Sequence, residues 1–225
     1  MRRIGVFGGT FDPVHEGHLK PAARAAAAFG LDELVFVPAG NPPHKLDEPR
    51  TPFAHRFAML ALATQDDDRL LVSDIELARE GPSYTVDTLS LFRKRYAAAA
   101  LYFLMGSDSF AQIGTWHRWE ALLPLANLVV LRRPAVWGEE LLARAPELLR
   151  PHATHVERGA AVAVGTPPAH RVYLLDHEPY AISSTEVRER VRSGRPIGDL
   201  MPAAVGRYIA KHRLYRGGEK GADER

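Results

Sequence analysis

The fold is decided by residues 5–18, Gly5-Val6-Phe7-Gly8-Gly9-Thr10-Phe11-Asp12-Pro13-Val14-His15-Glu16-Gly17-His18. Arg3–Phe7 is rich in β-branched and aromatic residues and therefore predicts a strand. Gly8-Gly9 then allows close approach of the backbone, and Asp12-Pro13 marks a turn before an alanine-rich helix predicted at Leu19–Phe29. A strand, a glycine turn and a helix N-terminus direct backbone N–H groups and the positive end of a helix dipole toward one place, where a phosphate can bind.

Two histidines, His15 and His18, lie three residues apart at this helix start. Both imidazoles can reach the same anion, and Gly17 between them lets the anion approach the backbone. The pair could instead ligate a metal, but no third Cys, His or carboxylate accompanies it at a spacing typical of a metal site. The stretch therefore predicts a phosphate site.

The rest of the chain alternates strands and helices, which is the pattern of a parallel sheet covered on both faces. The predicted strands are 3–7, 33–38, 70–77, 100–105, 127–131 and 171–176, and the predicted helices are 19–29, 52–64, 85–96, a helix carrying Trp116 and Trp119, 139–149, 182–194 and 202–212. We expect an α/β fold, a Rossmann-like open parallel sheet with helices on both faces and a small C-terminal helical part. Residues 1–215 are expected to form a single domain, with 132–169 as a surface excursion and 216–225 as a disordered tail.

Composition narrows the class of protein without identifying its chemistry. Apolar residues make up 46% of the 225-residue chain and charged residues 25%, as in an ordinary soluble globular protein. The chain has no cysteine, which excludes a disulfide framework and thiolate catalysis. It has no apolar run of the roughly 20 residues that span a bilayer, and it does not open with a signal-peptide pattern. The net charge of +2 does not favour nucleic acid as a partner. We expect a cytoplasmic protein with no membrane or nucleic-acid partner.

Four short motifs each follow a predicted strand: Gly8–Thr10, Asn41–Lys45, Gly106–Asp108 and Ile182–Thr185. In an open parallel sheet the carboxyl ends of the strands meet at one edge, and ligands bind there at the switch point. We therefore expect these motifs to form one shared site.

Residues 182–188, Ile182-Ser183-Ser184-Thr185-Glu186-Val187-Arg188, have two compatible interpretations. Ser183 and Glu186 form a capping-box pattern, which stabilises a helix start by about 1 kcal/mol. Arg188 lies one turn further on, so hydroxyl groups, free N–H groups and a guanidinium face the same way. That combination of donors suits a triphosphate.

Two further segments suggest a second ligand. Asn41-Pro42-Pro43-His44-Lys45 is a loop stiffened by prolines with a basic pair at its tip, although a lone His-Lys pair is also typical of a solvated turn. Residues 83–88, Ser83-Tyr84-Thr85-Val86-Asp87-Thr88, lead into a helix N-terminus, where a carboxylate is stabilised more than a neutral amide. Trp116 and Trp119 are, by themselves, typical core residues.

Together these motifs resemble the nucleotidyltransferase superfamily and, within it, the bacterial nicotinate-nucleotide adenylyltransferases. The corresponding elements are H-x-G-H at 15–18, N-P-P-H-K at 41–45, S-Y-T-x-D-T at 83–88, G-x-D at 106–108, W-x-x-W at 116–119 and I-S-S-T-x-[IV]-R at 182–188. The closing segment Tyr208–Tyr215 follows the family pattern Y-I-x-x-x-x-L-Y, which we interpret as packing. The resemblance runs from Arg3 to Tyr215 and breaks only across 132–169.

The resemblance implies adenylyl transfer from ATP to nicotinate mononucleotide, which yields deamido-NAD and pyrophosphate. It implies Mg²⁺ as a cofactor carried largely by the phosphates, with no side-chain metal ligands assigned. The implied catalytic residues are His15, His18 and Arg188. The implied ATP-binding residues are Gly8, Gly9, Thr10, Phe11, His15, His18, Gly106, Asp108, Ile182, Ser183, Ser184 and Arg188, and the implied mononucleotide-binding residues are His44, Lys45, Tyr84, Thr85 and Trp116. Trp116 is the indole expected to stack on the pyridine ring.

Two alternatives stay open at this point. Phosphopantetheine adenylyltransferase shares the H-x-G-H and S-S-T elements, but it does not call for the N-P-P-H-K loop or the S-Y-T-x-D-T segment. A nucleotide-binding regulator without turnover is the other alternative, and the presence of His15, His18 and Arg188 argues against it. An aminoacyl-tRNA synthetase fragment is disfavoured because the sequence has no K-M-S-K-S-like loop. Homo-oligomer formation is left open by the sequence.

Overall fold

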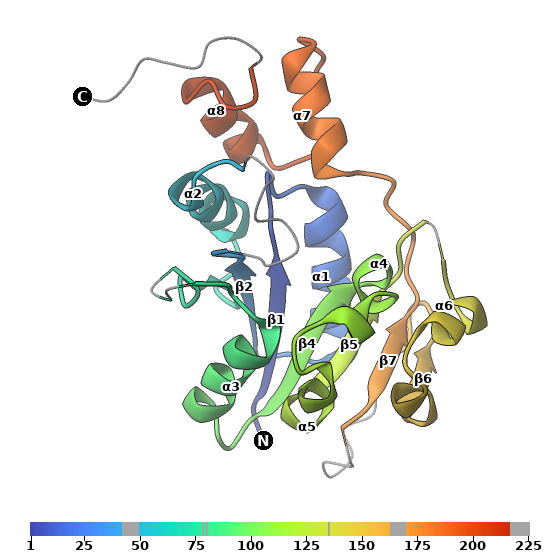
Figure 1. Ribbon diagram of the computed structural model, residues 1–225. Helices are drawn as coiled ribbons and strands as arrows, with labels where there is room; N and C mark the ends of the chain where they lie inside the picture. Colours follow the sequence, from blue (N-terminus) through green and yellow to red (C-terminus); the bar gives the residue numbers. More distant parts are fainter. Residues whose placement is uncertain (42–49, 78, 80, 135, 163–169, 217–225) are drawn as a thin grey trace.

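Seven parallel strands form one sheet in the order β3-β2-β1-β4-β5-β7-β6 (Figure 1). The computed structural model describes residues 1–225 except 42–49, 78, 80, 135, 163–169 and 217–225. The strands are β1 Arg3–Gly9, β2 Glu33–Pro38, β3 Leu70–Val72, β4 Ala100–Gly106, β5 Asn127–Leu131, β6 Ala153–Val156 and β7 Val172–Leu175. The α-helices are α1 Glu16–Phe29, α2 Phe53–Thr64, α3 Thr85–Arg95, α4 Ser107–Phe110, α5 Leu122–Leu125, α6 Glu139–Arg144, α7 Ser184–Arg192 and α8 Ala203–Lys211, and the 3₁₀ helices are η2 Ile113–Thr115, η3 Trp119–Ala121 and η4 Glu147–His152.

Helices cover both faces of the sheet, because side chains alternate between the two faces along each buried strand. On one face Phe7 and Phe36 belong to a core that includes residues of α1, α2, α7 and α8. On the other face Val6 and Phe103 belong to a core that includes residues of α3, α4, α5 and α6. The predicted open parallel sheet with helices on both faces is therefore confirmed.

The switch point of the sheet lies between β1 and β4. From β1 the chain adds β2 and β3 on one side, whereas β4 and β5 lie on the other side. Gly8-Gly9 ends β1 and Gly106 ends β4, and the two strands pair in parallel from Arg3↔Ala100 to Phe7↔Leu104. The glycine turn and the Gly106–Asp108 segment consequently lie together at the carboxyl edge of the sheet, where ligands bind in this class of fold.

The strand predicted at 70–77 is wrong in extent, and the helix predicted around Trp116 and Trp119 is wrong in type. The strand predicted at 70–77 ends at Val72, because a turn follows in which the N–H of Leu77 donates to the carbonyl of Asp74 (2.8 Å). Trp116 and Trp119 do not share a helix: Trp116 follows η2 with extended backbone angles (φ −79°, ψ 146°), and Trp119 opens η3.

The segment 132–169 contributes to the sheet, which the interpretation as a surface excursion missed. Strand β6 pairs in parallel with β7, with Ala153 opposite Val172, and forms one edge of the sheet (Figure 1). The helix predicted at 139–149 is divided into α6 and η4, because Pro146 follows Ala145 and holds that residue in an extended conformation. Residues 217–225 of the predicted tail lie outside the described residues. Within the part of the chain that the structure describes, no helix has the length and apolar character needed to cross a membrane.

Candidate active site

Helix α1 starts beside the end of β1 and carries the two predicted histidines. His15 is its N-cap residue, with extended backbone angles (φ −151°, ψ 172°), and His18 lies in its first turn. The backbone N–H of His15 donates to Nδ1 of His18 (3.3 Å), and the two ring centroids are 3.8 Å apart. Because Nδ1 of His18 accepts this bond, the proton of the neutral ring lies on Nε2, which is then available as a donor to a ligand.

Both histidines are held in the neutral form. Burial, and then the positive charge of Arg133, lower the pKa of His15 to about 3. The pKa of His18 is also lowered, first by burial and then by His15 and Arg133. Two imidazoles in ring contact beside a guanidinium cannot both be protonated without strong repulsion. The histidines therefore act as neutral hydrogen-bonding groups, and the positive charge of the site comes from arginines.

Two glycines of the motif are required by packing. A Cβ atom at Gly17 would lie 3.0 Å from the ring of His15 and 3.1 Å from the carbonyl oxygen of Ile182. A Cβ atom at Gly9 would lie 2.9 Å from the ring of Phe11. The sequence assigned Gly17 to close approach of an anion, and the structure adds that Gly17 itself packs between the ring of His15 and the carbonyl of Ile182 before α7.

Helix α7 begins at the motif 182–185 and is attached to the loop after β1. Its N-cap Ser183 accepts a hydrogen bond from the N–H of Glu186 (3.1 Å), which confirms one half of the predicted capping box. The carboxylate of Glu186 accepts from Arg190 (2.8 Å) rather than returning to the cap. Ser184 Oγ donates to the carbonyl of Pro13 (3.0 Å), and Arg188 Nη1 donates to the carbonyl of Asp12 (2.7 Å). The first turn of α7 therefore faces the same space as the start of α1.

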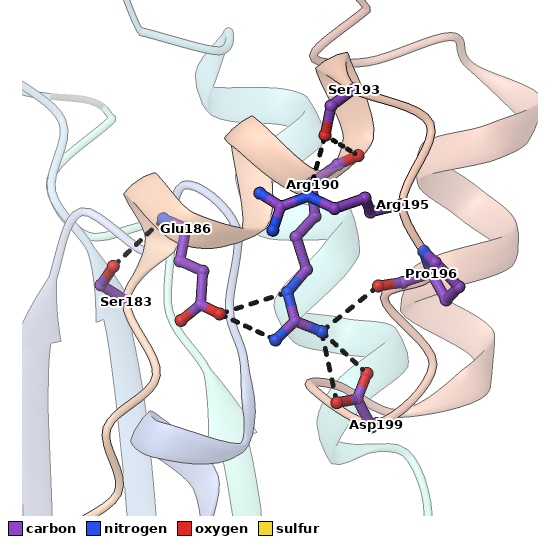
Figure 2. A network of polar contacts seen from close by, with 7 residues as sticks. All are labelled: Ser183, Glu186, Arg190, Ser193, Arg195, Pro196 and Asp199. Carbon is purple, nitrogen blue, oxygen red and sulfur yellow. Dashed lines mark hydrogen bonds and ion pairs between the residues drawn. The ribbon is translucent and has the colours of Figure 1, made fainter.

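A second set of contacts holds the turn that follows α7, and Figure 2 shows it around Arg190. The guanidinium of Arg190 bonds Glu186 one turn earlier (2.8 Å) and reaches both oxygens of Asp199 (3.3 Å each). The next residue, Leu200, accepts the backbone N–H of Glu16 at the start of α1 (2.7 Å). This bond links the two helix starts through the 193–200 turn, and it also means that the N–H of Glu16 is occupied.

The space between these elements is a cleft of about 770 Å³ at the carboxyl edge of the sheet. All the residues that the resemblance assigns to ATP line it: Gly8, Gly9, Thr10, Phe11, His15, His18, Gly106, Asp108, Ile182, Ser183, Ser184 and Arg188. Arg50, Arg133, Gln112 and Tyr180 are among its other lining residues. We refer to this space as the larger cleft.

A smaller pocket of about 270 Å³ adjoins the larger cleft. Tyr84, Thr85 and Trp116 line it, as do Gly8, Gly9, Thr10, Ser109 and Gln112, which line the larger cleft as well. Thr85 is the first residue of α3 and Tyr84 is its N-cap, so the free N–H groups of a helix start border this pocket. The two spaces share a wall, and this wall includes the end of β1.

A model of the cytidylyltransferase-like family matches residues 6–190. A probable nicotinate-nucleotide adenylyltransferase of Saccharopolyspora erythraea is 41% identical over 221 residues, which cover 98% of this chain and 93% of that protein. One of Pseudomonas paraeruginosa is 42% identical over 221 residues, with 96% of this chain and 98% of that protein covered. The chain belongs to the nicotinate-nucleotide adenylyltransferase family.

The solved structures agree with this assignment at the level of the fold. Plasmodium falciparum nicotinic acid mononucleotide adenylyltransferase complexed with NaAD superposes with a TM-score of 0.72 at 21% identity, covering 96% of this chain and 98% of that one. The predicted family, the predicted enzyme class and the Rossmann-like fold are confirmed. The chain is a nucleotidyltransferase of NAD biosynthesis.

Several residues around the site of this family member were not predicted from the sequence. Arg133 lies two residues after the end of strand β5 and donates to the carbonyl of Gly17 (3.1 Å), so the strand-end rule that found the motifs could have found it. Arg50 carried no such signal. Glu76 lines the smaller pocket, where its carboxylate accepts the Thr88 hydroxyl (2.7 Å) and the N–H of Gly40 (3.1 Å).

Arg56 is the most buried of the unpredicted cations, at 2% exposure. Its guanidinium donates to three backbone carbonyls, those of Thr10 (2.9 Å), Ala39 (2.8 Å) and Thr51 (3.0 Å). These carbonyls belong to the turn after β1, the end of β2 and the segment before α2. Arg56 therefore fixes three chain segments around the site, although nothing in its helical surroundings marked it. The predicted His44 and Lys45 lie outside the described residues.

The carboxylates of the larger cleft do not form a metal cage. Among the described residues, no three His, Cys, Asp or Glu side chains are grouped so that they could hold a metal ion. Asp12 has its two oxygens occupied, by the hydroxyl of Tyr215 (2.6 Å) and the N–H of Thr51 (3.1 Å). Asp108 is exposed at the edge of the cleft. This donor set fits a Mg²⁺ ion that is bound mainly through phosphate oxygens and water.

Proposed function

We propose that the chain transfers the adenylyl group of ATP to nicotinate mononucleotide, giving deamido-NAD and pyrophosphate. The observation that carries the proposal is the shared wall between the larger cleft and the smaller pocket at Gly8–Thr10. A nucleotide in one space and a mononucleotide in the other would bring the phosphate of the mononucleotide next to the α-phosphorus. In-line displacement requires that proximity more than it requires covalent participation by the protein.

In this proposal the triphosphate occupies the larger cleft. His15 and His18 contact it from the start of α1, and Arg188 with the first turn of α7 contacts it from the opposite side. The Gly8–Phe11 backbone and the segment from Gly106 to Asp108 bind the rest of the nucleotide, with Asp108 accepting ribose hydroxyls. Ser183 and Ser184 serve mainly through the backbone of the helix start, because their hydroxyls are engaged with Glu186 N–H and Pro13 C=O.

The nicotinate mononucleotide occupies the smaller pocket. Its carboxylate is placed at the first turn of α3, beside Tyr84 and Thr85, where free N–H groups and the helix dipole favour an anion. Trp116 stacks on its pyridine ring, and His44 and Lys45 hold its phosphate. The buried carboxylate of Glu76 does not compete for these donors, since its oxygens already accept from Thr88 and Gly40.

The chemistry follows from the charges of the groups. A phosphate monoester is ionised at neutral pH, so its oxygen can attack the α-phosphorus without a general base. The new P–O bond forms as the bond from the α-phosphorus to pyrophosphate breaks, so this direct transfer needs no covalent enzyme intermediate. The protein stabilises the charge on the α-phosphoryl oxygens and on the departing pyrophosphate, with hydrogen bonds from neutral His18 and His15 and with the guanidinium of Arg188. Mg²⁺ held on the phosphates would neutralise part of that charge.

Pyrophosphate release from ATP and Mg²⁺ tests the proposal, with nicotinate mononucleotide, nicotinamide mononucleotide and phosphopantetheine as parallel acceptors. We expect release chiefly with the nicotinate compound. Equal kcat/KM for the acid and the amide would contradict the carboxylate site at α3. Release chiefly with phosphopantetheine would overturn the assignment of the smaller pocket, and ATP binding without release from any acceptor would indicate a regulator.

A further inference from the structure

The side chain and the main chain of Asp12 join three parts of the molecule. Asp12 as a whole is 6% exposed, and its carboxylate accepts hydrogen bonds from the hydroxyl of Tyr215 (2.6 Å) and the N–H of Thr51 (3.1 Å). Its carbonyl accepts Nη1 of Arg188 (2.7 Å). Asp12, which lies in the turn after β1, therefore also binds the guanidinium of Arg188, an arginine that lines the larger cleft.

Tyr215 reaches this junction from the end of α8. The helix ends at Lys211, the N–H of Leu214 then bonds back to the carbonyl of Ile209 (3.1 Å), and Arg213 and Tyr215 take positive φ angles (54° and 63°). Burial, and then the charge of Asp12, raise the pKa of the Tyr215 hydroxyl. The hydroxyl therefore stays protonated over the working pH range and donates to the carboxylate.

Thr51 gives the junction a second connection. Its N–H binds Asp12 (3.1 Å), and its carbonyl accepts Nε of Arg56 (3.0 Å), so the peptide groups on both sides of this residue are fixed. Thr51 directly precedes Pro52, the N-cap residue of α2. Asp12 is accordingly in contact with the larger cleft through Arg188 and with the segment before α2 through Thr51.

We propose that Tyr215 is a positioning residue for the adenylyl-transfer reaction. Tyr215 fixes Asp12 through its hydroxyl, and the carbonyl of Asp12 in turn fixes the guanidinium of Arg188 in the larger cleft. The inference rests on the proposed function for its chemistry. Arg188 has a long side chain, and its Nη2 has a further partner in the Thr185 hydroxyl (3.2 Å), so small movements of the Asp12 carbonyl re-aim the guanidinium. A misplacement of about 1 Å can lower the rate of a positioned reaction by about two orders of magnitude.

The alternative is that Tyr215 serves only to pack the end of α8, as the sequence suggested. Tyr208, which lies within α8 itself, offers a matched control. Its hydroxyl bonds Nδ1 of His55 on α2 (2.8 Å), it comes from the same C-terminal segment, and it lies outside both the larger cleft and the smaller pocket. Removing either hydroxyl deletes one partly buried hydrogen bond, but only Tyr215 contacts the residue that seats Arg188.

The experiment compares five proteins: the parent, Tyr215→Phe, Tyr208→Phe, Arg188→Ala and the Arg188→Ala/Tyr215→Phe double variant. We expect Tyr215→Phe to lower kcat/KM for ATP about tenfold, as loss of a hydrogen bond to a charged group that positions a catalytic cation. Tyr208→Phe should stay within about twofold of the parent while lowering Tm comparably. If Tyr215 acts through Arg188, its loss should have no further effect beyond about twofold in the Arg188→Ala background.

Three results would overturn the inference: parental kcat/KM in Tyr215→Phe, an equal loss in Tyr208→Phe, or a full additional tenfold loss in the double variant. Calorimetric titration of ATP without acceptor measures the same double-mutant cycle as a binding constant, independently of turnover. We expect Tyr215→Phe to bind ATP about fivefold more weakly than the parent, and Arg188→Ala and the double variant to have equal Kd. If the parent releases no pyrophosphate with any acceptor, the proposed function fails. The ATP titrations still decide whether Tyr215 positions Arg188.

Discussion

Replacement of Arg56 by lysine is the sharpest test of how the segments around the larger cleft are held together. The guanidinium is buried and makes three hydrogen bonds of 2.8–3.0 Å to carbonyls from three different segments. Its planar fork directs separate nitrogens at the three acceptors. A lysine ammonium keeps the charge, but its donors diverge from a single atom and cannot reach all three carbonyls.

The magnitude follows from the bonds that lysine cannot replace. If one of the three bonds is retained, two buried carbonyls lose a charged donor, and each such loss costs about 1.5–3 kcal/mol. Burial lowers the pKa of the Arg56 guanidinium, and the nearby Asp12 carboxylate opposes that shift, so the site already bears a desolvation cost for its cation. We expect Arg56→Lys to lower the free energy of unfolding by about 3 kcal/mol. For a domain of this size that is a fall in Tm of about 8 °C.

Thermal unfolding followed by circular dichroism measures the loss of stability. Pyrophosphate release, assayed well below the unfolding temperature, measures the loss of activity. Arg93→Lys is the matched control: Arg93 also donates to carbonyls, those of Ala99 (2.9 Å) and Leu125 (3.2 Å from Nε), but at the amino end of β4, away from the cleft. Both variants should lose stability, and only Arg56→Lys should lower kcat/KM, by at least about fivefold. A Tm within about 2 °C of the parent would refute the energetic argument, and equal losses of activity in the two variants would refute the assignment of Arg56 to the site.

Three other outcomes follow from the same structure. His18→Ala should lower kcat about 100-fold or more with nearly unchanged affinity for the mononucleotide, measured by steady-state kinetics and calorimetry; a kcat within a few-fold of the parent would remove His18 from this role. Because the pKa of His15 is about 3 in the folded chain and near 6.5 in the unfolded chain, the unfolded state binds more protons between those values. The free energy of unfolding should therefore decrease as pH drops below about 6.5, and His15 contributes at most about 1.4 kcal/mol per pH unit to that decrease. The difference in Tm between about pH 7.5 and about pH 5 should be smaller in His15→Gln than in the parent. Arg190→Met should shift Tm by less than about 2 °C, because Asp199 is 65% exposed and such ion pairs are weak; a shift as large as that of Arg56→Lys would contradict this ranking.

The sequence was sufficient for the parts of the site that are continuous in the chain. The glycine turn, the two histidines and the cap at Ser183 lie where local propensity and strand-end logic placed them, and the parallel sheet followed from the alternation of elements. Strand β6 was missed because a four-residue edge strand between Pro-interrupted segments has little periodicity of its own. Arg56 was missed because its function depends on three carbonyls that are distant in the sequence, which no local pattern records.

The positions of the arginines around the turn after β1 have a common physical reason. Three arginines and one serine donate to carbonyls of the 10–17 segment: Arg56 to Thr10, Arg188 to Asp12, Ser184 to Pro13 and Arg133 to Gly17. A loop that turns its N–H groups toward an anion must turn carbonyls elsewhere, and a carbonyl buried without a donor costs free energy. Cations that satisfy those carbonyls would also raise the positive potential at the proposed anion site, so one set of side chains would perform both tasks. In the proposed phosphate site, the glycine and histidine motif therefore specifies only half of the donors, and the other half is supplied by guanidinium groups from α2, α7 and the segment after β5.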